Sequence, residues 1–321
     1  MSEWTDQTDW GDQTEDDLVL IPYHEPKAFH RSLRFITDDY ERFLSKTEEF
    51  REQNDIKNCS QWQFQVDGQK VHTIYTSSQS GTPDEWSNSD EEINEYLNGI
   101  FEDREINFVL LVDTIFLSIT DDIPDESMRL YKKFDLESLA EVVRNVQWRQ
   151  PVPEVATQLL SEFICQHPMP NTNHRSGISI LGRYLRTFDE DIELPKTGVD
   201  DEWHDWAEDY ILSSKRHLTL RRKAGLLRYA HSLGVDAVQR KEGIIINLNS
   251  ELENLQRPDA FQYYTQQHRN ATQPFVDHLL ERSDATHLRN ITDDGKRAFL
   301  DRIATDYSFD EASETPAINE K

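Results

Sequence analysis

Apolar side chains recur every three to four residues along most of the chain. This spacing places them on one face of a helix and leaves the other face polar. A run of such spacing from Phe29 to Leu44 predicts a helix within 22–53. Further on, the pattern predicts one or two helices over 93–119, and others over 136–146, 154–166, 178–188, 201–233 and 260–280. The chain is therefore expected to be mainly α-helical.

Two short stretches have the pattern of β-strands. Apolar residues alternate with polar ones at 62–66 and again at 71–75, on either side of Asp67-Gly68. Asp-Gly is a typical two-residue hairpin turn, and pairing across it puts Phe64 opposite Val71. Residues 243–248 are apolar and are expected to form a strand or a buried turn.

A stretch rich in Ser, Gly, Pro and Asn at 77–90 predicts a loop and a boundary between regions. We divide the chain into a disordered acidic N-terminus at 1–20, an N-terminal α+β region with the hairpin at 21–95, a helical domain at 96–250, a C-terminal helical region at 251–305 and an acidic tail at 306–321.

Acidic side chains outnumber basic ones by 61 to 34, so the formal charge is −27. This balance argues against a protein that coats nucleic acid or an anionic membrane over its whole surface. An acidic regulatory protein and a protein of a salt-rich cytosol both fit the charge. The acids are spread along the whole chain instead of being gathered in one tail, which favours the halophilic interpretation, since molar salt screens charges beyond about 3 Å.

The remaining composition points to a cytoplasmic protein. Only Cys59 and Cys165 are present, so no disulfide framework is expected and the compartment is expected to be reducing. The longest apolar stretch, 108–119, is interrupted by Asp113 and is too short to span a bilayer. The first residues show neither the basic nor the apolar region of a secretory signal, and we expect no membrane partner.

The segment His167-Pro-Met-Pro-Asn-Thr-Asn-His-Arg175 joins two predicted helices and carries candidate chemistry. Pro168 and Pro170 are expected to end the first helix and to stiffen the connection. The imidazole of His167 titrates near neutrality, so it is suited to take a proton from an incoming hydroxyl group. His167 is therefore the candidate catalytic base.

The second helix is expected to start at Asn173, whose side chain suits an N-cap. The first amides of a helix and its dipole bind anions, and the Arg175 guanidinium adds a fork for phosphate oxygens. The candidate phosphate-binding residues are Asn173, His174, Arg175 and Ser176. A base beside a phosphate cradle predicts phosphoryl or nucleotidyl transfer.

The segment resembles the signature of the Fic/Doc (Fido) family, which reads His-Pro-Phe-x-(Asp/Glu)-Gly-Asn-(Gly/Lys)-Arg across a helix–loop–helix. The resemblance extends over 151–188 and implies a small all-α core. The predicted fold class is then mainly α, with a Fido-like helical domain at 96–250 and a small β-hairpin in the N-terminal region. The matched positions are His167, Pro168, Asn173 and Arg175.

The resemblance implies a transferase that moves AMP from ATP, or a phosphoryl group as in the Doc branch, to a protein hydroxyl. Such an enzyme is a nucleotidyltransferase (AMPylation) or a kinase, toxin-like or regulatory. His167 would be the base, and Asn171 a weak Mg²⁺ ligand, because it replaces the family's acid with an uncharged amide. The implied cofactors are ATP and Mg²⁺, and the implied partners are a target protein with a hydroxyl side chain and an antitoxin or regulatory protein.

Several positions depart from the family pattern. Met169 replaces a core-anchoring Phe, Thr172 replaces a Gly, and His174 stands where the Doc branch has Lys. Ile178 replaces a second phosphate-binding Arg, and loss of such a charge-assisted bond costs about 1.5–3 kcal/mol. The alternative hypothesis is therefore a catalytically weak Fido scaffold used for binding or regulation.

One basic concentration stands out in this acidic chain, at 215–228. A solvated helix face that balances the acids of 201–209 is the simpler interpretation. A contact for nucleotide phosphates, nucleic acid or an acidic target is the sharper alternative. Its basic residues are Lys215, Arg216, His217, Arg221, Arg222, Lys223 and Arg228.

Overall fold

A computed structural model of the chain describes residues 31–54, 59–66, 68–77, 90–121, 132–194, 202–232, 234–240, 244–248, 252 and 257–306. Contacts between Cα atoms divide the chain into two compact units. We call residues 1–80 with 223–257 the sheet unit, and residues 81–222 with 258–321 the helical unit. The predicted disordered N-terminus, 1–20, lies outside the described residues, and so does the predicted acidic tail, 306–321, except for Asp306, which is the last residue of a helix.

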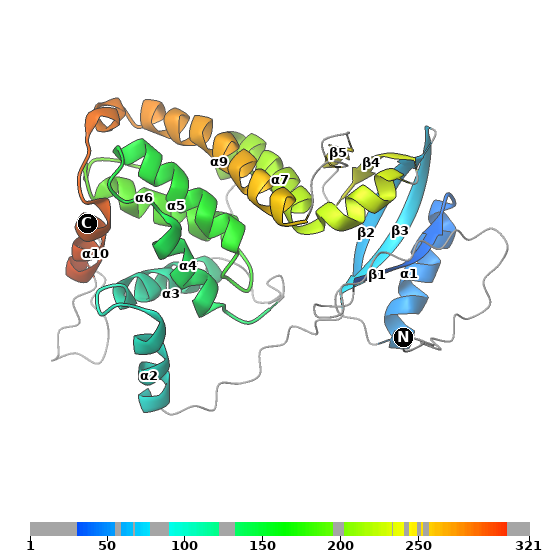
Figure 1. Cartoon of the computed structure of the whole chain (residues 1–321), viewed down its shortest axis with the longest axis horizontal. Helices are drawn as coiled ribbons and strands as arrows, with labels where there is room; N and C mark the ends of the chain where they lie inside the picture. The colour runs from blue at the N-terminus through cyan, green and yellow to red at the C-terminus, as the bar shows by residue number, and fades with distance from the viewer. Residues whose placement is uncertain are drawn as a thin grey trace. The chain divides into compact units, whose positions relative to one another are not determined.

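The sheet unit is built on an antiparallel sheet (Figure 1). The predicted hairpin is confirmed, with Phe64 opposite Val71 and Gly68 at a φ of 78° in the turn. A left-handed φ is the conformation that glycine adopts without strain. The strands of the described residues, in spatial order, are β1 (Arg31–Thr37), β3 (Gln69–Ser77), β2 (Cys59–Val66), β4 (Val235–Gln239) and β5 (Ile245–Asn247).

The helix predicted within 22–53 is wrong in its first part. Residues Arg31–Thr37 form strand β1, which pairs with β3, and the helix α1 is confined to Tyr40–Asn54. Residues 22–30 lie outside the described part. Phe29, Leu33 and Phe35 suggested a helix by spacing alone, whereas pairing with a sheet edge satisfies the backbone groups of this segment. Tertiary context overrides a local pattern in such cases.

The helical unit confirms the predicted mainly α class. Each apolar stripe from residue 90 onward lies in a helix, and of the described helices none is long and apolar enough to cross a membrane. The elements are α2 (Asp90–Ile100), α3 (Ile106–Asp121), α4 (Leu136–Asn145), α5 (Val152–Gln166), α6 (Asn173–Arg186), α7 (Glu202–Ser232), α9 (Arg257–Arg282), the 3-10 helix η2 (Thr286–Asn290) and α10 (Gly295–Asp306).

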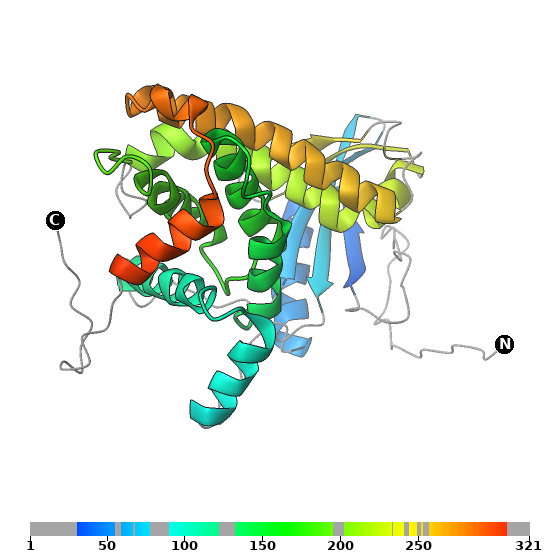
Figure 2. The ribbon, with the colours of Figure 1, turned by 60° about the vertical axis from the view of Figure 1, so that its left-hand side comes forward.

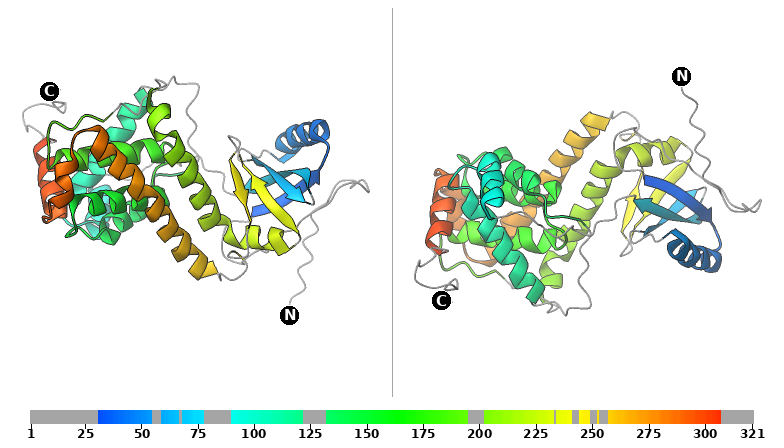
Figure 3. Two further views of the ribbon diagram at one scale, coloured as in Figure 1. Left: turned by 90° about the horizontal axis from the view of Figure 1, so that it is seen from above. Right: turned by 90° about the horizontal axis from the view of Figure 1, so that it is seen from below.

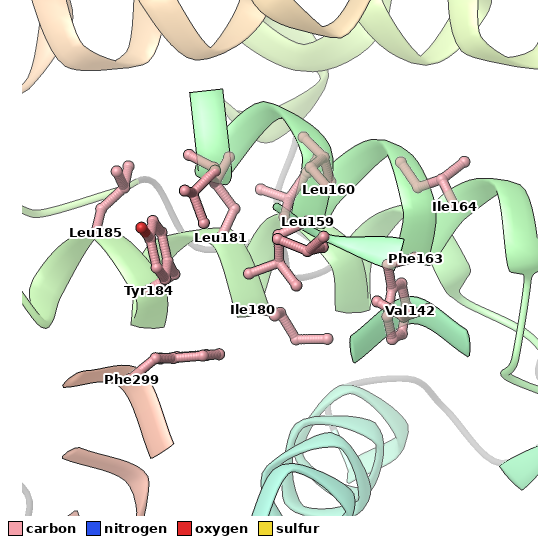
Figure 4. Packing of buried hydrophobic residues seen from close by; sticks show 14 of the residues in the cluster. Val142, Leu159, Leu160, Phe163, Ile164, Ile180, Leu181, Tyr184, Leu185 and Phe299 are labelled. Carbon is pink, nitrogen blue, oxygen red and sulfur yellow. The ribbon is translucent and has the colours of Figure 1, made fainter. Parts of the chain in front are cut away.

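Helices α5 and α6 form the centre of the core, with α3, α4 and α10 around them (Figure 2). Figure 4 shows the apolar side chains of α5 and α6 converging, and Phe299 of α10 lying beside Tyr184 at a ring distance of 5.5 Å. A Cβ atom on Gly177 would lie 3.0 Å from Leu160 Cδ1, so the two helices approach closely there. This packing holds the loop between α5 and α6 in place.

Helices α7 and α9 lie side by side and run antiparallel (Figure 3). Tyr210 faces Thr272, Ser214 faces His268, and Arg221 faces Thr265. From Lys223 onward α7 belongs to the sheet unit. Residues 223–250, which the sequence prediction joined to the helical domain, are thus grouped with the sheet, because β4 pairs with β2.

Candidate functional site

The predicted helix–loop–helix is present, and His167 ends its first helix. His167 adopts a left-handed conformation (φ 56°, ψ 53°), and its backbone N–H donates to the Phe163 carbonyl at 3.0 Å. The loop is also held from outside, since the Asp135 amide donates to the Pro168 carbonyl at 2.9 Å. Met169 is fully buried, as expected of the residue that anchors the loop in the core.

The helix start differs from the prediction. Thr172, not Asn173, is the N-cap of α6, with φ 56° and no side-chain capping bond. Asn173 is the first helical residue and is buried. Its Oδ1 accepts from the Met169 amide and its Nδ2 donates to the Met169 carbonyl, both at 3.0 Å. Two bonds across the loop replace the single bond of a cap, so Asn173 shapes the loop.

The other predicted phosphate-binding residues follow on α6. His174 is half-buried, and its Nε2 lies 2.9 Å from Ser214 Oγ on α7. Arg175 is half-buried, and burial lowers the pKa of its guanidinium. Ser176 is buried, with its hydroxyl 3.3 Å from that of Thr172. These residues lie in the first turn of α6, and the positive end of the helix dipole there favours an anion.

His167 has a strongly perturbed environment. Burial, followed by the charges of Arg222, Lys132 and His174, lowers the pKa of its imidazole well below the usual range. Burial also lowers the pKa of Lys132, as does Arg222, whereas Asp135 raises it. His167 is therefore neutral at pH 7 and able to accept a proton.

Arg222, one of the cations that act on His167, follows Arg221, which connects α7 to the end of α5. Arg221 donates from Nη1 to the Cys165 carbonyl at 2.8 Å, and its guanidinium lies 3.6 Å from the ring centre of Phe261. Arg221 is only 7% exposed, so the interpretation of 215–228 as a purely solvated face is wrong at this position. Anchoring the C-terminal end of α5 to α7 brings positive charge close to His167.

Asn171, the predicted weak Mg²⁺ ligand, lies in the loop just before α6. Its Oδ1 accepts from the Thr172 amide at 2.7 Å. Among the described residues, no group of three or more His, Cys, Asp and Glu side chains could hold a metal ion. Mg²⁺ at nucleotide sites is usually bound by one or two protein oxygens together with substrate phosphates and waters, so the role of Asn171 as a Mg²⁺ ligand stays a prediction. A polyphosphate matches the positive charge around His167.

Sequence reasoning missed Lys132 and Arg222 as neighbours of His167. They lie 35 residues before and 55 residues after it in the chain, so no local motif joins them. The basic concentration at 215–228 was the available signal for Arg222. For Lys132 the sequence offers no such signal, because the residue lies in no motif and in no basic concentration.

Together, the fold and the loop define a mainly α-helical protein with a cationic helix–loop–helix at its core. The chain belongs to the sequence family described as "Family of unknown function (DUF8172)", which matches residues 18–307. No curated protein and no solved structure matches the chain. The family description assigns no activity, so the resemblance to the Fic/Doc family stays a prediction.

Proposed function

We propose that this protein is a Fic/Doc-type transferase that moves AMP or a phosphoryl group from ATP to a protein hydroxyl. The arrangement that supports it most is His167 at the loop between α5 and α6, where burial, and then the charges of Arg222 and Lys132, lower the pKa of its imidazole. A base must be unprotonated at working pH, and both causes favour that form while making the imidazole a weaker base. The same charge attracts the polyphosphate of a nucleotide.

In this proposal His167 takes the proton of the target hydroxyl, whose oxygen then bonds to a phosphorus atom of ATP. Attack at the α-phosphorus breaks its bond to the bridging oxygen and releases pyrophosphate. Attack at the γ-phosphorus releases ADP. In both cases the proton ends on His167, and Lys132 and Arg222 stabilise the negative charge that shifts toward the leaving group.

The roles on α6 are adjusted to the geometry. Arg175 and the helix start bind phosphate, and Asn173 supports them by holding the loop closed. The second motif arginine is replaced by Ile178, which is buried. In this proposal Lys132 and Arg222 supply the positive charge that the second motif arginine would supply. A protein with this activity acts as a toxin-like or regulatory modifier, with a target protein and a controlling partner.

Transfer is tested with ATP labelled separately at the α- and γ-phosphates, incubated with a protein lysate in high salt. Incorporated α-label identifies AMP transfer, and γ-label alone identifies phosphoryl transfer. His167→Ala is expected to abolish labelling, whereas His278→Ala, at an exposed histidine on α9, retains it. Labelling that persists in His167→Ala contradicts the assigned base.

A binding protein without turnover is the second candidate. It is favoured by the hydrogen bonds of Asn173 to Met169, which occupy a side chain that the resemblance assigns to phosphate. Calorimetry with ATP at high salt distinguishes the two. Binding with no label transfer to any lysate protein supports the regulatory scaffold over the enzyme.

A further inference from the structure

Helix α1 covers one side of the sheet over only part of its width. The rings of Tyr40 and Phe43 on α1 lie 5.0 and 5.4 Å from the ring of His72 on β3. Helix α1 contacts β1 and β3, at the opposite end of the sheet from β4 and β5 (Figure 1). On this side, β4 and β5 therefore extend beyond the helix.

The strand register assigns seven residues of β2, β4 and β5 to the side of the sheet that α1 occupies. Residues directly opposite each other in an antiparallel pair share a face, and side chains alternate between the faces along a strand. Gln63 lies opposite both His72 and Gln239, and Gln239 lies opposite Ile245. Alternation along the three strands completes the set, which we call the amide face: Gln61, Gln63, Gln65, Ala237, Gln239, Ile245 and Asn247.

The amide face differs in composition from the rest of this chain. Five of its seven residues carry a carboxamide and none is acidic, although acids make up 61 of the 321 residues. Within the described part of the chain, none of these five carboxamides forms a hydrogen bond. Each has two donor hydrogens and an acceptor oxygen, so the face can bind a polar partner without charge repulsion. Gln65, Ile245 and Asn247 are exposed, and Gln61, Gln63 and Gln239 are half-buried.

Exposed apolar side chains gather on the same side of the sheet. An open antiparallel face is often simply solvated, and polar residues alone would fit that interpretation. However, six large apolar side chains are exposed among the described residues, and three of them lie here. They are Tyr40 and Leu44 of α1, at 52% and 37% exposure, and Ile245 of the amide face, at 54%. Apolar side chains rimmed by polar ones favour a protein partner.

Helix α1 carries acceptors that match the donors of the amide face. Exposed Glu41 and Glu48 lie three residues before and four residues after Leu44, so they share its flank of the helix. We call Tyr40, Glu41, Leu44 and Glu48 the α1 flank. Two chains that each carry a formal charge of −27 repel, so copies of this chain are expected to associate over a surface without acids. The amide face is such a surface.

We propose that the protein forms a homodimer in which the α1 flank of each copy lies on the amide face of the other. The contact is two-fold symmetric, so each copy contributes both surfaces. Amide N–H groups of one copy then donate to the carboxylates of Glu41 and Glu48 of the other, and Ile245 is covered by apolar side chains. This inference does not depend on the proposed transferase activity.

Sedimentation equilibrium of the full chain measures the association, in KCl at about 1 M to screen the net charge. The wild type is expected to have twice the chain mass of 37.7 kDa. Gln239→Glu puts a carboxylate in the middle of the amide face, against Glu41 and Glu48 of the other copy. It is expected to raise the dissociation constant of the dimer about tenfold, since like charges at an interface repel. Gln239→Lys, with the opposite charge, is expected to keep the dimer. Gln262→Glu, the same change at an exposed position on α9, is the matched control and is expected to keep the wild-type dissociation constant.

Crosslinking tests the arrangement of the two copies without added charge. Leu44→Cys and Ile245→Cys are made as separate proteins in a Cys59→Ser background, and the remaining Cys165 is buried. A mixture of the two proteins, treated with a short bismaleimide, is expected to give more covalent dimer than either protein alone, because position 44 of one copy meets position 245 of the other.

Three results would overturn the proposal. A monomeric wild type leaves the amide face to a different partner. A dimer that Gln239→Glu leaves unchanged, or that Gln239→Glu and Gln239→Lys weaken equally, is held by another surface or by other forces. A mixture that crosslinks no better than the separate proteins rejects the contact between the α1 flank and the amide face. All of these results leave the ATP-labelling test of the transferase unaffected.

Discussion

The side chain of Asn173 forms two hydrogen bonds with the backbone of Met169, accepting from its N–H and donating to its carbonyl, each at 3.0 Å. Asn173 is the first residue of α6, and Met169 is fully buried within the loop. The amide group therefore holds the loop against the helix it precedes. Both Met169 backbone groups are satisfied by one side chain, because an amide group carries an acceptor oxygen and a donor nitrogen.

Asn173→Ala is expected to destabilise the protein by about 1–3 kcal/mol, because it leaves buried backbone groups of Met169 without their partner. The free energy of unfolding from denaturant titration measures this. Asn171→Ala, which removes one half-exposed bond to the Thr172 amide, is the control and is expected to cost less than about 1 kcal/mol. Equal losses in the two variants would contradict the assigned role of Asn173.

The loop between α5 and α6 shows which features of the fold can be predicted from the sequence and which cannot. The helices on both sides and the hairpin register at Phe64 follow from periodicity and turn chemistry, which are local. The burial of Met169 was expected from the family resemblance. The N-cap was misplaced by one residue, because Asn at a helix start suits a cap and only the three-dimensional loop reveals its bonds to Met169. Strand β1 was missed for a similar reason, since its partner β3 is distant in sequence.

Apart from the basic concentration that contains Arg222, sequence reasoning did not identify the surroundings of His167. Lys132 and Arg222, whose charges lower the pKa of His167, come from distant segments. Close to them in the chain, the Asp135 amide bonds to the Pro168 carbonyl and the Arg221 side chain to the Cys165 carbonyl. The hydrogen-bonded side chains of Ser161, His268, Ser214 and His174 likewise join the consecutive helices α5 and α6 to α7 and α9, which lie further along the chain. Helical periodicity identifies which residues face the core, but it does not say which polar side chains meet there.

Neutralising the cations beside His167 is expected to raise the pKa of its imidazole. Arg222→Gln and Lys132→Gln each remove a charge that disfavours imidazolium. Arg222 is exposed, so solvent screens its charge, and we expect the rise in the pKa of His167 to be smaller still in molar salt. Titration of the His167 ring resonances by NMR measures it. Arg216→Gln, an exposed change on the same helix, is the control; a pKa equally insensitive to all three variants would refute the cationic environment.

Stability is expected to fall as the pH is lowered from 7 to 5. Burial puts the pKa of His268 at about 3 in the folded protein, far below the usual 6.5. Between these values the unfolded chain binds one more proton than the folded chain, so the free energy of unfolding decreases by up to about 1.4 kcal/mol per pH unit. His167, whose pKa is also lowered, adds a loss of the same sign.

The dependence of the free energy of unfolding on pH is measured by urea titration at several pH values between 5 and 7. His268→Gln is expected to be less stable at pH 7 but to show a shallower slope, since glutamine does not titrate. His278→Gln, at an exposed position, is expected to keep the wild-type slope. A slope unchanged in His268→Gln would show that this histidine does not stay neutral inside the fold.

Salt is expected to stabilise the protein strongly. A formal charge of −27 on 321 residues makes like charges repel in the compact state, and they move apart on unfolding. Screening shortens from about 10 Å at 0.1 M salt to about 3 Å at 1 M, so the repulsion is largely removed at molar salt. The melting temperature should therefore rise with KCl, steeply at first and then more slowly. Sucrose at equal osmolality separates charge screening from general solute exclusion, because it stabilises compact states without screening charge. A melting temperature that rises as much in sucrose as in KCl would contradict the halophilic interpretation of the charge.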